Sequence, residues 1–245
     1  EATIVDITNE VSPQNIVGAA FVLDTAYRYF PSTTIHVAVV DPGVGSLRRA
    51  VLLETPLGRF VAPDNGILSY ILRDAGVASV HSSPVEYPSL RSIPDDYKAY
   101  NLTKEEFWLH PTSHTFHGRD IFASIGAHLA NGIQPEELGD PITKLICLEI
   151  PDPHLDEKTI IGQIIHVDHF GNLVTNILAA NIAESAIFEI SGHRIHGLSR
   201  NYVEGSELLA IAGSHGYVEI SAREASAAHT LNAWPGQNVC LNQTC

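Results

Sequence analysis

The sequence predicts an α/β fold for the N-terminal part of the chain and an all-β fold for the C-terminal part. In the first part, strand-like and helix-like segments alternate, which is typical of a mostly parallel central sheet flanked by helices. After about residue 160, short strand-like runs follow one another with Gly and Asn turns between them. The 245 residues are 44% apolar and 17% charged, which supports a folded core and excludes a disordered chain. We therefore expect two domains, at residues 1–151 and 152–245.

Apolar patterning places the first elements of the N-terminal domain. Residues 3–7 (TIVDI) predict a short strand, and residues 16–29 predict a helix with Ser12 as its N-cap and Pro13 in its first turn. Residues 34–40 (TIHVAVV) form a nearly continuous β-branched run, as expected of a strand buried on both faces.

A hairpin, two helices and a long loop follow. Residues 49–62 predict a hairpin turned at Pro-Leu-Gly, and residues 67–76 and 118–130 predict helices. Between those helices, residues 83–115 are rich in Pro, Ser and Tyr. They predict a long loop of the kind that usually forms a lid or a contact surface.

The C-terminal domain is predicted from strand-like runs that follow a Pro- and Asp-bearing connector near residue 152. In chain order, the runs are IIGQIIHVD, NLVTNI, AIFEIS, LLAIAG, YVEISA and QNVCLN. Runs of this length with short polar turns predict an antiparallel, all-β domain.

Charge and cysteine content limit the partners and the setting. The chain has 14 basic and 28 acidic residues, a formal net charge of −14, which argues against nucleic acid as a partner. No run approaches the roughly 18 to 20 apolar residues of a membrane span, so no membrane partner is expected. Three cysteines, Cys147, Cys240 and Cys245, are too few for a disulfide framework. We expect free thiols and a cytoplasmic location, with a Cys240–Cys245 disulfide as the alternative.

Two polar residues of the first domain lie where predicted elements begin or end. Asp41 follows a predicted strand, at the end of the strand where α/β sheets bind ligands. The alternative is an ordinary Asp-Pro-Gly turn. His117 stands at the start of a helix, where free backbone N–H groups and the helix dipole favour an anion. The alternative is a histidine packed beside Phe116.

A metal site is another possibility for this domain. His110, His114 and His117, with Asp41 or Asp120, are suitable ligand types, but their spacings match no known metal signature. The Gly-Val-Gly stretch after Asp41 lacks the Lys and the spacing of a nucleotide-binding loop.

The second domain contains one candidate binding segment, HVDHFGN. Its Asp168, Phe170 and Asn172 supply an anion, an aromatic face and an amide, which suits a purine together with an ammonium group. The alternative is a plain hairpin turned at Gly171-Asn172.

Five motifs, in the same order as in a known family, extend over essentially the whole chain. They are VVDPGVGSLRR, FVAPDNGILS, TFHGRDIFASIGAHLANG, HVDHFGNLVTNI and SHGYVEISAREA. In these motifs the chain resembles the S-adenosyl-L-methionine (SAM) hydroxide adenosyltransferases, which are related to the fluorinase and chlorinase enzymes. The resemblance implies an N-terminal α/β domain, a C-terminal β-barrel-like domain and no metal or redox cofactor. It also implies a homotrimer, with substrate between the N-terminal domain of one subunit and the C-terminal domain of its neighbour.

The resemblance further implies the reaction and its catalytic residues. Hydroxide-using members share an Asp, an Arg seven residues later and the His of TFHG, which are Asp41, Arg48 and His117 here. Halogenases carry Tyr at the Asp position, and the fluorinase has Ser at the position of Gly118. Asp41 therefore favours water over halide, and the implied activity is hydrolysis of SAM to adenosine and L-methionine. The alternatives are a halogenase of the same family, a metal-dependent hydrolase, or a non-catalytic adenosine- or SAM-binding module.

Substrate-binding residues are carried over from the motifs of the second domain. By resemblance, Asp168 would hold the methionine amino group and Ser214 the methionine end, while Phe170 and Asn172 would face the adenosine. The remaining implied contacts are Glu219 and, through their backbone near the adenine, Arg223 and Ala225.

Two features depart from the family pattern. His215 stands where the fluorinase has Arg. Family members also begin with a strand and an Asp-bearing loop that binds the ribose hydroxyls, whereas this sequence starts after them. We therefore expect an N-terminal segment to be missing from it.

Overall fold

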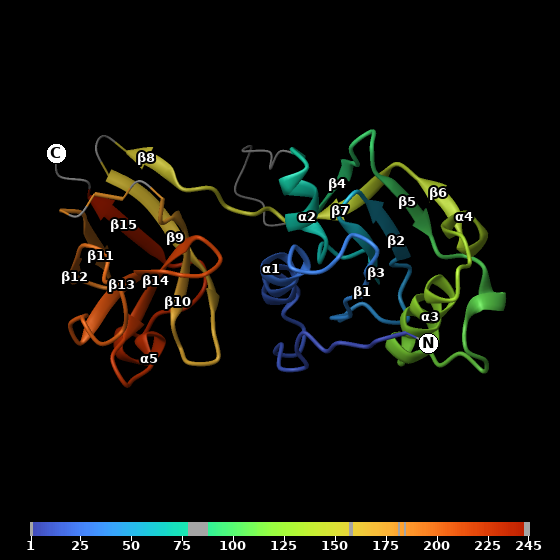
Figure 1. The fold of residues 1–245 in the computed structure, drawn as a ribbon, viewed down its shortest axis with the longest axis horizontal. Coiled ribbons are helices and arrows are strands. Elements are labelled where there is room, and N and C mark those ends of the chain that lie inside the picture. Colours follow the sequence, from blue (N-terminus) through green and yellow to red (C-terminus); the bar gives the residue numbers. More distant parts are fainter. Residues whose placement is uncertain (1, 78–87, 157–158, 181, 184, 243–245) are drawn as a thin grey trace. The chain divides into compact units, whose positions relative to one another are not determined.

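The computed structural model describes residues 2–77, 88–156, 159–180, 182–183 and 185–242 (Figure 1). The chain divides into two compact units, Glu1–Ile150 and Pro151–Cys245. No helix among the described residues is long and apolar enough to cross a bilayer.

A five-stranded mixed sheet forms the centre of the first unit, with strand order β1-β3-β2-β5-β6. Its strands are β1 (Ile35–Val37), β2 (Ala50–Thr55), β3 (Gly58–Pro63), β5 (Lys98–Asn101) and β6 (Asp140–Ile142). Within these strands only β1 and β3 pair in parallel, and the other neighbours are antiparallel. The prediction of a mostly parallel sheet is therefore wrong. The reason is that the hairpin β2–β3, which the sequence does predict, and the distant β5 and β6 all add antiparallel neighbours.

Part of the predicted long loop is strand. In addition to β5, the segment contains β4 (Ser89–Ser92), which pairs with β7 (Lys144–Cys147), and a 3₁₀ turn at Glu105–Phe107. Four-residue strands that pair with distant segments leave too little local periodicity to be predicted. Residues 78–87, which include the start of the predicted loop, lie outside the described residues.

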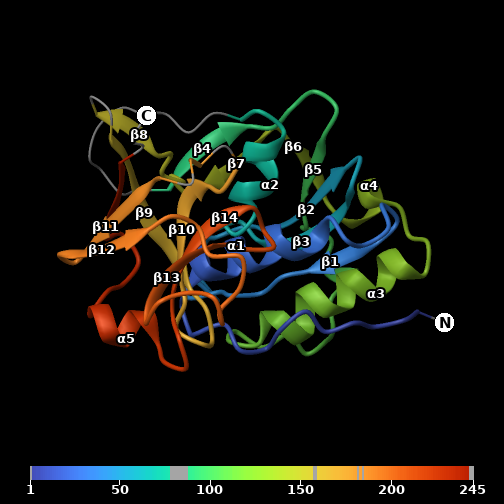
Figure 2. The same cartoon turned by 60° about the vertical axis from the view of Figure 1, so that its left-hand side comes forward.

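Helices cover both faces of the five-stranded sheet (Figures 1 and 2). Successive residues of a strand point to opposite faces. Accordingly, Val51 and Leu53 enter one apolar cluster and Leu52 enters the other. The first cluster includes residues of α1 (Ile16–Tyr27) and α2 (Ser69–Asp74), and the second includes residues of α3 (Ser124–Ala130) and α4 (Pro135–Leu138).

Three predictions near the N-terminus are wrong in detail. Residues 3–7 pair with no described strand, and Ile4 is 88% exposed; a strand is stable only where its backbone groups find a partner. The N-cap of α1 is Asn15 rather than Ser12, because the Asn15 side chain accepts a hydrogen bond from the Gly18 N–H at 2.8 Å. β1 is an edge strand, so Val37 is exposed and the run is not buried on both faces.

An eight-stranded antiparallel sheet forms the second unit, with order β12-β11-β15-β9-β10-β14-β13 and β8 paired to β9. The sheet nearly closes into a barrel, because the Ser199 N–H after β12 donates to the Ala210 carbonyl of β13 at 2.8 Å. An antiparallel, barrel-like C-terminal region is thus confirmed. The strands are β8 (His154–Asp156), β9 (Thr159–Val167), β10 (Leu173–Leu178), β11 (Ile187–Ile190), β12 (His193–His196), β13 (Leu208–Ala212), β14 (Tyr217–Ala222) and β15 (Asn238–Asn242).

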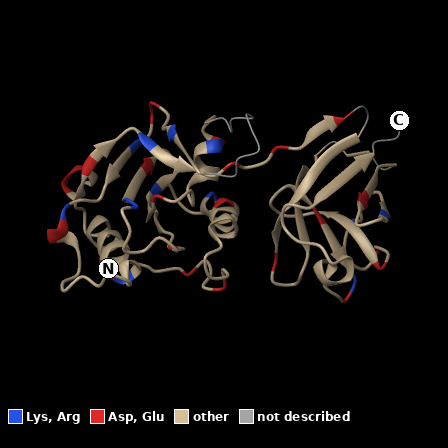
Figure 3. Cartoon of the chain, turned by 180° about the vertical axis from the view of Figure 1, so that it is seen from behind, with Lys and Arg blue, Asp and Glu red and all other residues tan. Residues whose placement is uncertain are grey.

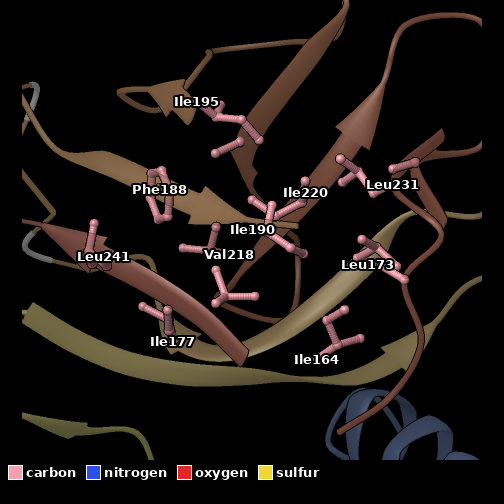
Figure 4. Packing of buried hydrophobic residues seen from close by; sticks show 14 of the residues in the cluster. Ile164, Leu173, Ile177, Phe188, Ile190, Ile195, Val218, Ile220, Leu231 and Leu241 are labelled. Carbon is pink, nitrogen blue, oxygen red and sulfur yellow. The ribbon is translucent and has the colours of Figure 1, made fainter. Parts of the chain in front are cut away.

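The six predicted runs correspond to β9, β10, β11, β13, β14 and β15, and the helix α5 (Ala227–Leu231) lies between the last two. Apolar side chains fill the inside of the sheet (Figure 4). The side chains labelled there are each 4% exposed or less: Ile164, Leu173, Ile177, Phe188, Ile190, Ile195, Val218, Ile220, Leu231 and Leu241. The interior of this unit is therefore largely apolar, with Thr175, Asn176 and Ser221 among its buried polar residues.

Acidic side chains are spread over both units (Figure 3). In the first unit, many arginines already pair with a carboxylate: Arg28, Arg48, Arg49, Arg59 and Arg119. The charge of these five arginines is therefore neutralised locally.

Candidate active site

Asp41 is positioned by an extension of the edge strand β1. Beyond the strand, the Ala38 N–H donates to the Val61 carbonyl of β3 at 3.0 Å. The side-chain amide of Asn65 donates to the Val40 carbonyl at 2.8 Å. The backbone is thus fixed up to the residue before Asp41, which stands at the carboxyl end of the strand as predicted.

The turn that follows returns the chain to Arg48, just before β2. The Ser46 hydroxyl donates to the Gly43 carbonyl at 2.7 Å and accepts from the Arg48 N–H at 3.2 Å. Gly45 has a φ of +77°, and a Cβ there would lie 2.7 Å from the His114 carbonyl oxygen. A glycine is therefore needed both for the left-handed backbone and for the contact of this turn with the segment before His117.

His117 is brought to the same place by the helical segment that begins at Gly118. A Cβ on Gly126 would lie 2.9 Å from the Val37 side chain, and one on Gly118 would lie 3.6 Å from the Val39 side chain. Small residues at these two positions let the helical segment lie directly against β1 and its extension.

The segment before His117 is held by Asp120, which is fully buried. The Asp120 carboxylate accepts hydrogen bonds from the Ser113 N–H at 2.8 Å and from the Arg119 guanidinium. These bonds favour the charged form and hold the pKa of Asp120 below its usual range. Asp120 is therefore a structural anchor for the loop that carries His117.

Asp41, Arg48 and His117 form one connected group. The Arg48 Nε donates to Asp41 Oδ1 at 3.0 Å and to Oδ2 at 2.9 Å, and Arg48 Nη2 lies 2.5 Å from Oδ2. The same Nη2 lies 2.8 Å from His117 Nδ1. The side chains of Asp41 and Arg48 are only 6% and 10% exposed, so solvent weakens this charge pair little.

The contact with Arg48 fixes the tautomer of His117. A guanidinium only donates hydrogen bonds, so Nδ1 must accept and the ring proton must be on Nε2. Burial is the main cause that lowers the pKa of His117, and the Arg48 charge lowers it further, although Asp41 acts in the opposite direction. His117 is thus a neutral imidazole that offers one N–H.

Asp41 also lines an open pocket of about 410 Å³, a volume within the range of small-molecule sites. The other residues that line it come from the segment before α1 and from the strand extension and turn around Asp41: Val11, Ser12, Pro13, Gln14, Val39, Val40, Pro42 and Val44.

In the second unit, Asp168 and Asn172 organise the turn between β9 and β10. Asp168 Oδ1 accepts the N–H groups of Phe170 and Asn172 at 2.9 and 2.8 Å, and Oδ2 accepts the Asn172 amide at 2.8 Å. Gly171 has a φ of +84° and no room for a Cβ beside Ser226. The predicted hairpin is thus present, formed by β9 and β10. Phe170, in its turn, is 76% exposed.

The other predicted binding residues lie on β14 and in the turns next to it. Ser214, Arg223 and Ala225 are exposed, and Glu219 is half-buried on β14. The structure therefore places the seven residues of this unit in the β9–β10 turn, in the β13–β14 turn, along β14 and just after it.

Three polar residues near the predicted binding residues of this unit, His215, Tyr202 and His166, were not predicted as site residues. His215 Nε2 lies 2.9 Å from Glu219 Oε1, and the Tyr202 hydroxyl donates to Oε2 at 3.4 Å. Burial lowers the pKa of His166, while the nearby Asp168 acts to raise it. The sequence signal for His215 is its place beside Ser214 in SHGY. No sequence signal marks Tyr202, because its partner Glu219 lies on the separate strand β14.

The histidines proposed as metal ligands do not converge. His110 Nε2 lies 2.8 Å from the Glu105 carbonyl oxygen, whereas His117 faces Arg48. Across the part of the chain that the structure describes, no three His, Cys, Asp or Glu side chains are grouped so that they could hold a metal ion.

Comparison with known proteins identifies the family. Residues 1–139 match the SAM hydroxide adenosyltransferase N-terminal domain, and residues 162–240 match the C-terminal domain. The chain belongs to the SAM hydroxide adenosyltransferase family. The resemblance seen in the five sequence motifs is thereby confirmed.

Relatives in this family include two proteins named (R)-S-adenosyl-L-methionine hydrolase. The one from Thermus thermophilus is 34% identical over 97% of this chain and 87% of its own length. The one from Methanocaldococcus jannaschii is 32% identical over 95% of this chain and 80% of its own length. A fluorinase from Nocardia brasiliensis is 24% identical over 98% of this chain and 86% of its own length.

A solved structure has a closely similar fold. An uncharacterized conserved protein from Thermotoga maritima gives a TM-score of 0.82 at 30% sequence identity, covering 98% of this chain and 89% of that one.

Proposed function

We propose that this protein is an enzyme that hydrolyses SAM to adenosine and L-methionine, with water attacking C5′ of the ribose. The observation that carries the proposal is the contact group of Asp41, Arg48 and His117 beside an open pocket. The names of the hydrolase relatives, at 32% and 34% identity over nearly the whole chain, support the same substrate.

The leaving group needs no catalytic residue of its own. The bond from C5′ to the sulfonium sulfur breaks with its electron pair going to sulfur, and neutral methionine departs without a general acid. What the protein must supply is a water molecule about 3 Å from C5′, in line with the C–S bond. The electron pair of the breaking C–S bond cancels the positive charge on sulfur, while the proton of the attacking water neutralises a negatively charged base. Because opposite charges disappear together, a site shielded from bulk water favours the transition state.

The three residues divide this task by their hydrogen-bonding capacity. Asp41 is the proton acceptor, because Oδ1 takes only one of the three Arg48 contacts and retains a lone pair for the water. Arg48 orients that carboxylate. His117 donates its Nε2 proton to the water oxygen, since its Nδ1 is occupied by Arg48.

The polar residues of the second unit are proposed to bind the rest of the substrate. The exposed ring of Phe170 supports stacking against the adenine, and the Asp168 carboxylate supports a charge contact with the methionine ammonium. Asn172 and, through their backbone, Arg223 and Ala225 are proposed to face the adenosine, with Ser214 and Glu219 at the methionine end.

We propose two functional domains, residues 1–151 and 152–245, in a homotrimer whose neighbouring subunits supply the two residue groups of one site. We also propose a cytoplasmic location, which is supported by the buried free thiol of Cys147. Cys245, the partner of Cys240 in the alternative disulfide, lies outside the described residues.

Incubation with SAM in ¹⁸O-labelled water tests the activity. We expect equal amounts of adenosine and L-methionine, with one labelled oxygen at the 5′ position of adenosine and no effect of a chelator. A 5′-halo-adenosine formed on adding halide would show a halogenase, and loss of activity with chelator would show a metal-dependent hydrolase. Binding of SAM without any product would leave only a binding module.

The turnover number is expected to fall on the acid side, below the ordinary histidine pKa of about 6.5. Protonation of Nδ1 would set an imidazolium against Arg48, and the lowered pKa of His117 keeps the active neutral form present at pH 7 and down to lower pH than a free histidine would allow. His117→Gln keeps one acceptor and one donor without titrating, so its turnover number should be flat from about pH 5 to 8. An unchanged acid limb in that variant would assign the limb to another group.

A further inference from the structure

The aromatic ring of Phe122 lies under the guanidinium of Arg48. The Arg48 Cζ is 5.2 Å from the ring centroid, and Phe122 is fully buried. A cation held against a buried ring face gains a desolvated cation–π interaction. Arg48 thus contacts Asp41 and His117 through its N–H groups and at the same time lies over the face of the Phe122 ring.

A local irregularity of the helix puts the ring there. Residues Gly118–Ala123 form a π-helical turn, which continues into α3. In an α-helix, the residue five positions after His117 would point about 140° away from it around the axis. A π-turn has i→i+5 hydrogen bonds and more residues per turn than an α-helix, so Phe122 is rotated back towards the direction of His117.

This placement of the ring matters because one nitrogen of Arg48 serves two partners. Nη2 lies 2.5 Å from Asp41 Oδ2 and 2.8 Å from His117 Nδ1, which requires the guanidinium plane to contain both directions. The hydrogen bonds fix the guanidinium edge, and the ring limits rotation of its plane.

We propose that Phe122 is a positioning residue of the reaction: its ring holds the Arg48 guanidinium in the plane from which Nη2 reaches both Asp41 and His117. This inference rests on the proposed hydrolysis for its kinetic consequence. Its other consequence, a change in the pKa and tautomer of His117, can be measured without any activity. The charged and titratable groups that act on His117 are Arg48, Asp41, Asp120 and His114. Because Arg48 lowers the pKa of His117, loss of the Arg48 contact should raise that pKa.

Phe122→Leu tests the proposal, because leucine remains apolar but offers no ring face. We expect the turnover number to fall about tenfold, with KM changed by less than about twofold. The acid limb should move to higher pH, because a displaced Arg48 no longer depresses the pKa of His117. Proton–nitrogen NMR of the full chain without substrate should show the same rise of the His117 pKa and partial loss of the Nε2–H tautomer, with the His117 signal assigned by His117→Gln.

Phe60→Leu is the matched control. Phe60 is buried in the same unit but packs in the other apolar cluster, against Tyr27 and His36. It should lower the melting temperature by a similar amount while leaving the turnover number, the acid limb and the His117 signal as in the natural chain. Equal changes in both variants, or no change of His117 in Phe122→Leu, would overturn the inference. If the natural chain releases no adenosine, the proposed function fails, while the NMR result still decides the role of Phe122.

Discussion

An Asp41→Asn variant is expected to turn over at least about 100-fold more slowly than the natural chain, the usual scale for loss of a positioned base. Asparagine has the same shape and can still accept a hydrogen bond from Arg48, so the group should stay assembled. It has no negative charge and cannot take the proton of the attacking water. Adenosine release at saturating SAM, followed by chromatography, measures the effect, and KM should change little.

A second aspartate gives a matched control for this change. Asp64 also pairs with an arginine, Arg49, and is 3% exposed, but it accepts the Ile146 N–H of β7 instead of lining the pocket. Asp64→Asn should lower the melting temperature without slowing turnover. If Asp41→Asn kept the natural rate, Asp41 would have no part in proton transfer.

An Asp168→Asn variant is expected to raise KM for SAM by roughly 10- to 100-fold, which is the range for loss of a hydrogen bond to a charged group. Asparagine retains Oδ1, which accepts the Phe170 and Asn172 backbone N–H groups, so the backbone of the turn stays held, while the Asn172 side-chain amide loses its acceptor at Oδ2. What is removed is the charge proposed to hold the methionine ammonium. Initial rates over a wide range of SAM concentration give KM, and circular dichroism checks the fold. An unaltered KM would remove Asp168 from the substrate site.

The same two variants test the proposed homotrimer. In a mixed trimer of Asp41→Asn and Asp168→Asn subunits, some interfaces would join a natural Asp41 of one subunit to a natural Asp168 of the next. Co-expression should therefore restore activity well above either variant alone at low SAM concentration, and light scattering should give three times the mass of one chain. If each site were contained in one subunit, mixing would restore nothing.

Local pattern predicted the strands of the second unit well, because each is a short apolar run closed by turn residues. It missed β8, whose three residues are all exposed, and β12, whose HRIH sequence has only one buried residue. In the first unit, local pattern predicts the direction of pairing only for the hairpin β2–β3. The run at residues 34–40 is equally compatible with a parallel centre and with an edge, and the antiparallel β5 and β6 come from distant parts of the chain.

The catalytic candidates illustrate the same limit. Asp41 and Arg48 are seven residues apart, and the turn between them is predictable from Asp-Pro-Gly. His117 is 69 residues from Arg48, so its contact came from family resemblance and not from spacing. Phe122 could not be predicted at all, since the buried positions of residues 118–130 look like an ordinary amphipathic helix and nothing in the sequence marks the π-turn.

The tightly filled interior of the barrel-like unit has a consequence for how ligand preference can change. Because Ile, Leu, Val and Phe side chains occupy the inside of the sheet, most of the proposed binding residues fall on turns such as residues 168–172 and 213–216, outside the core. If these turns bind ligand as proposed, ligand preference can change there without any change to the apolar core of this unit. A library confined to these two turns should yield altered ligand preference from folded protein.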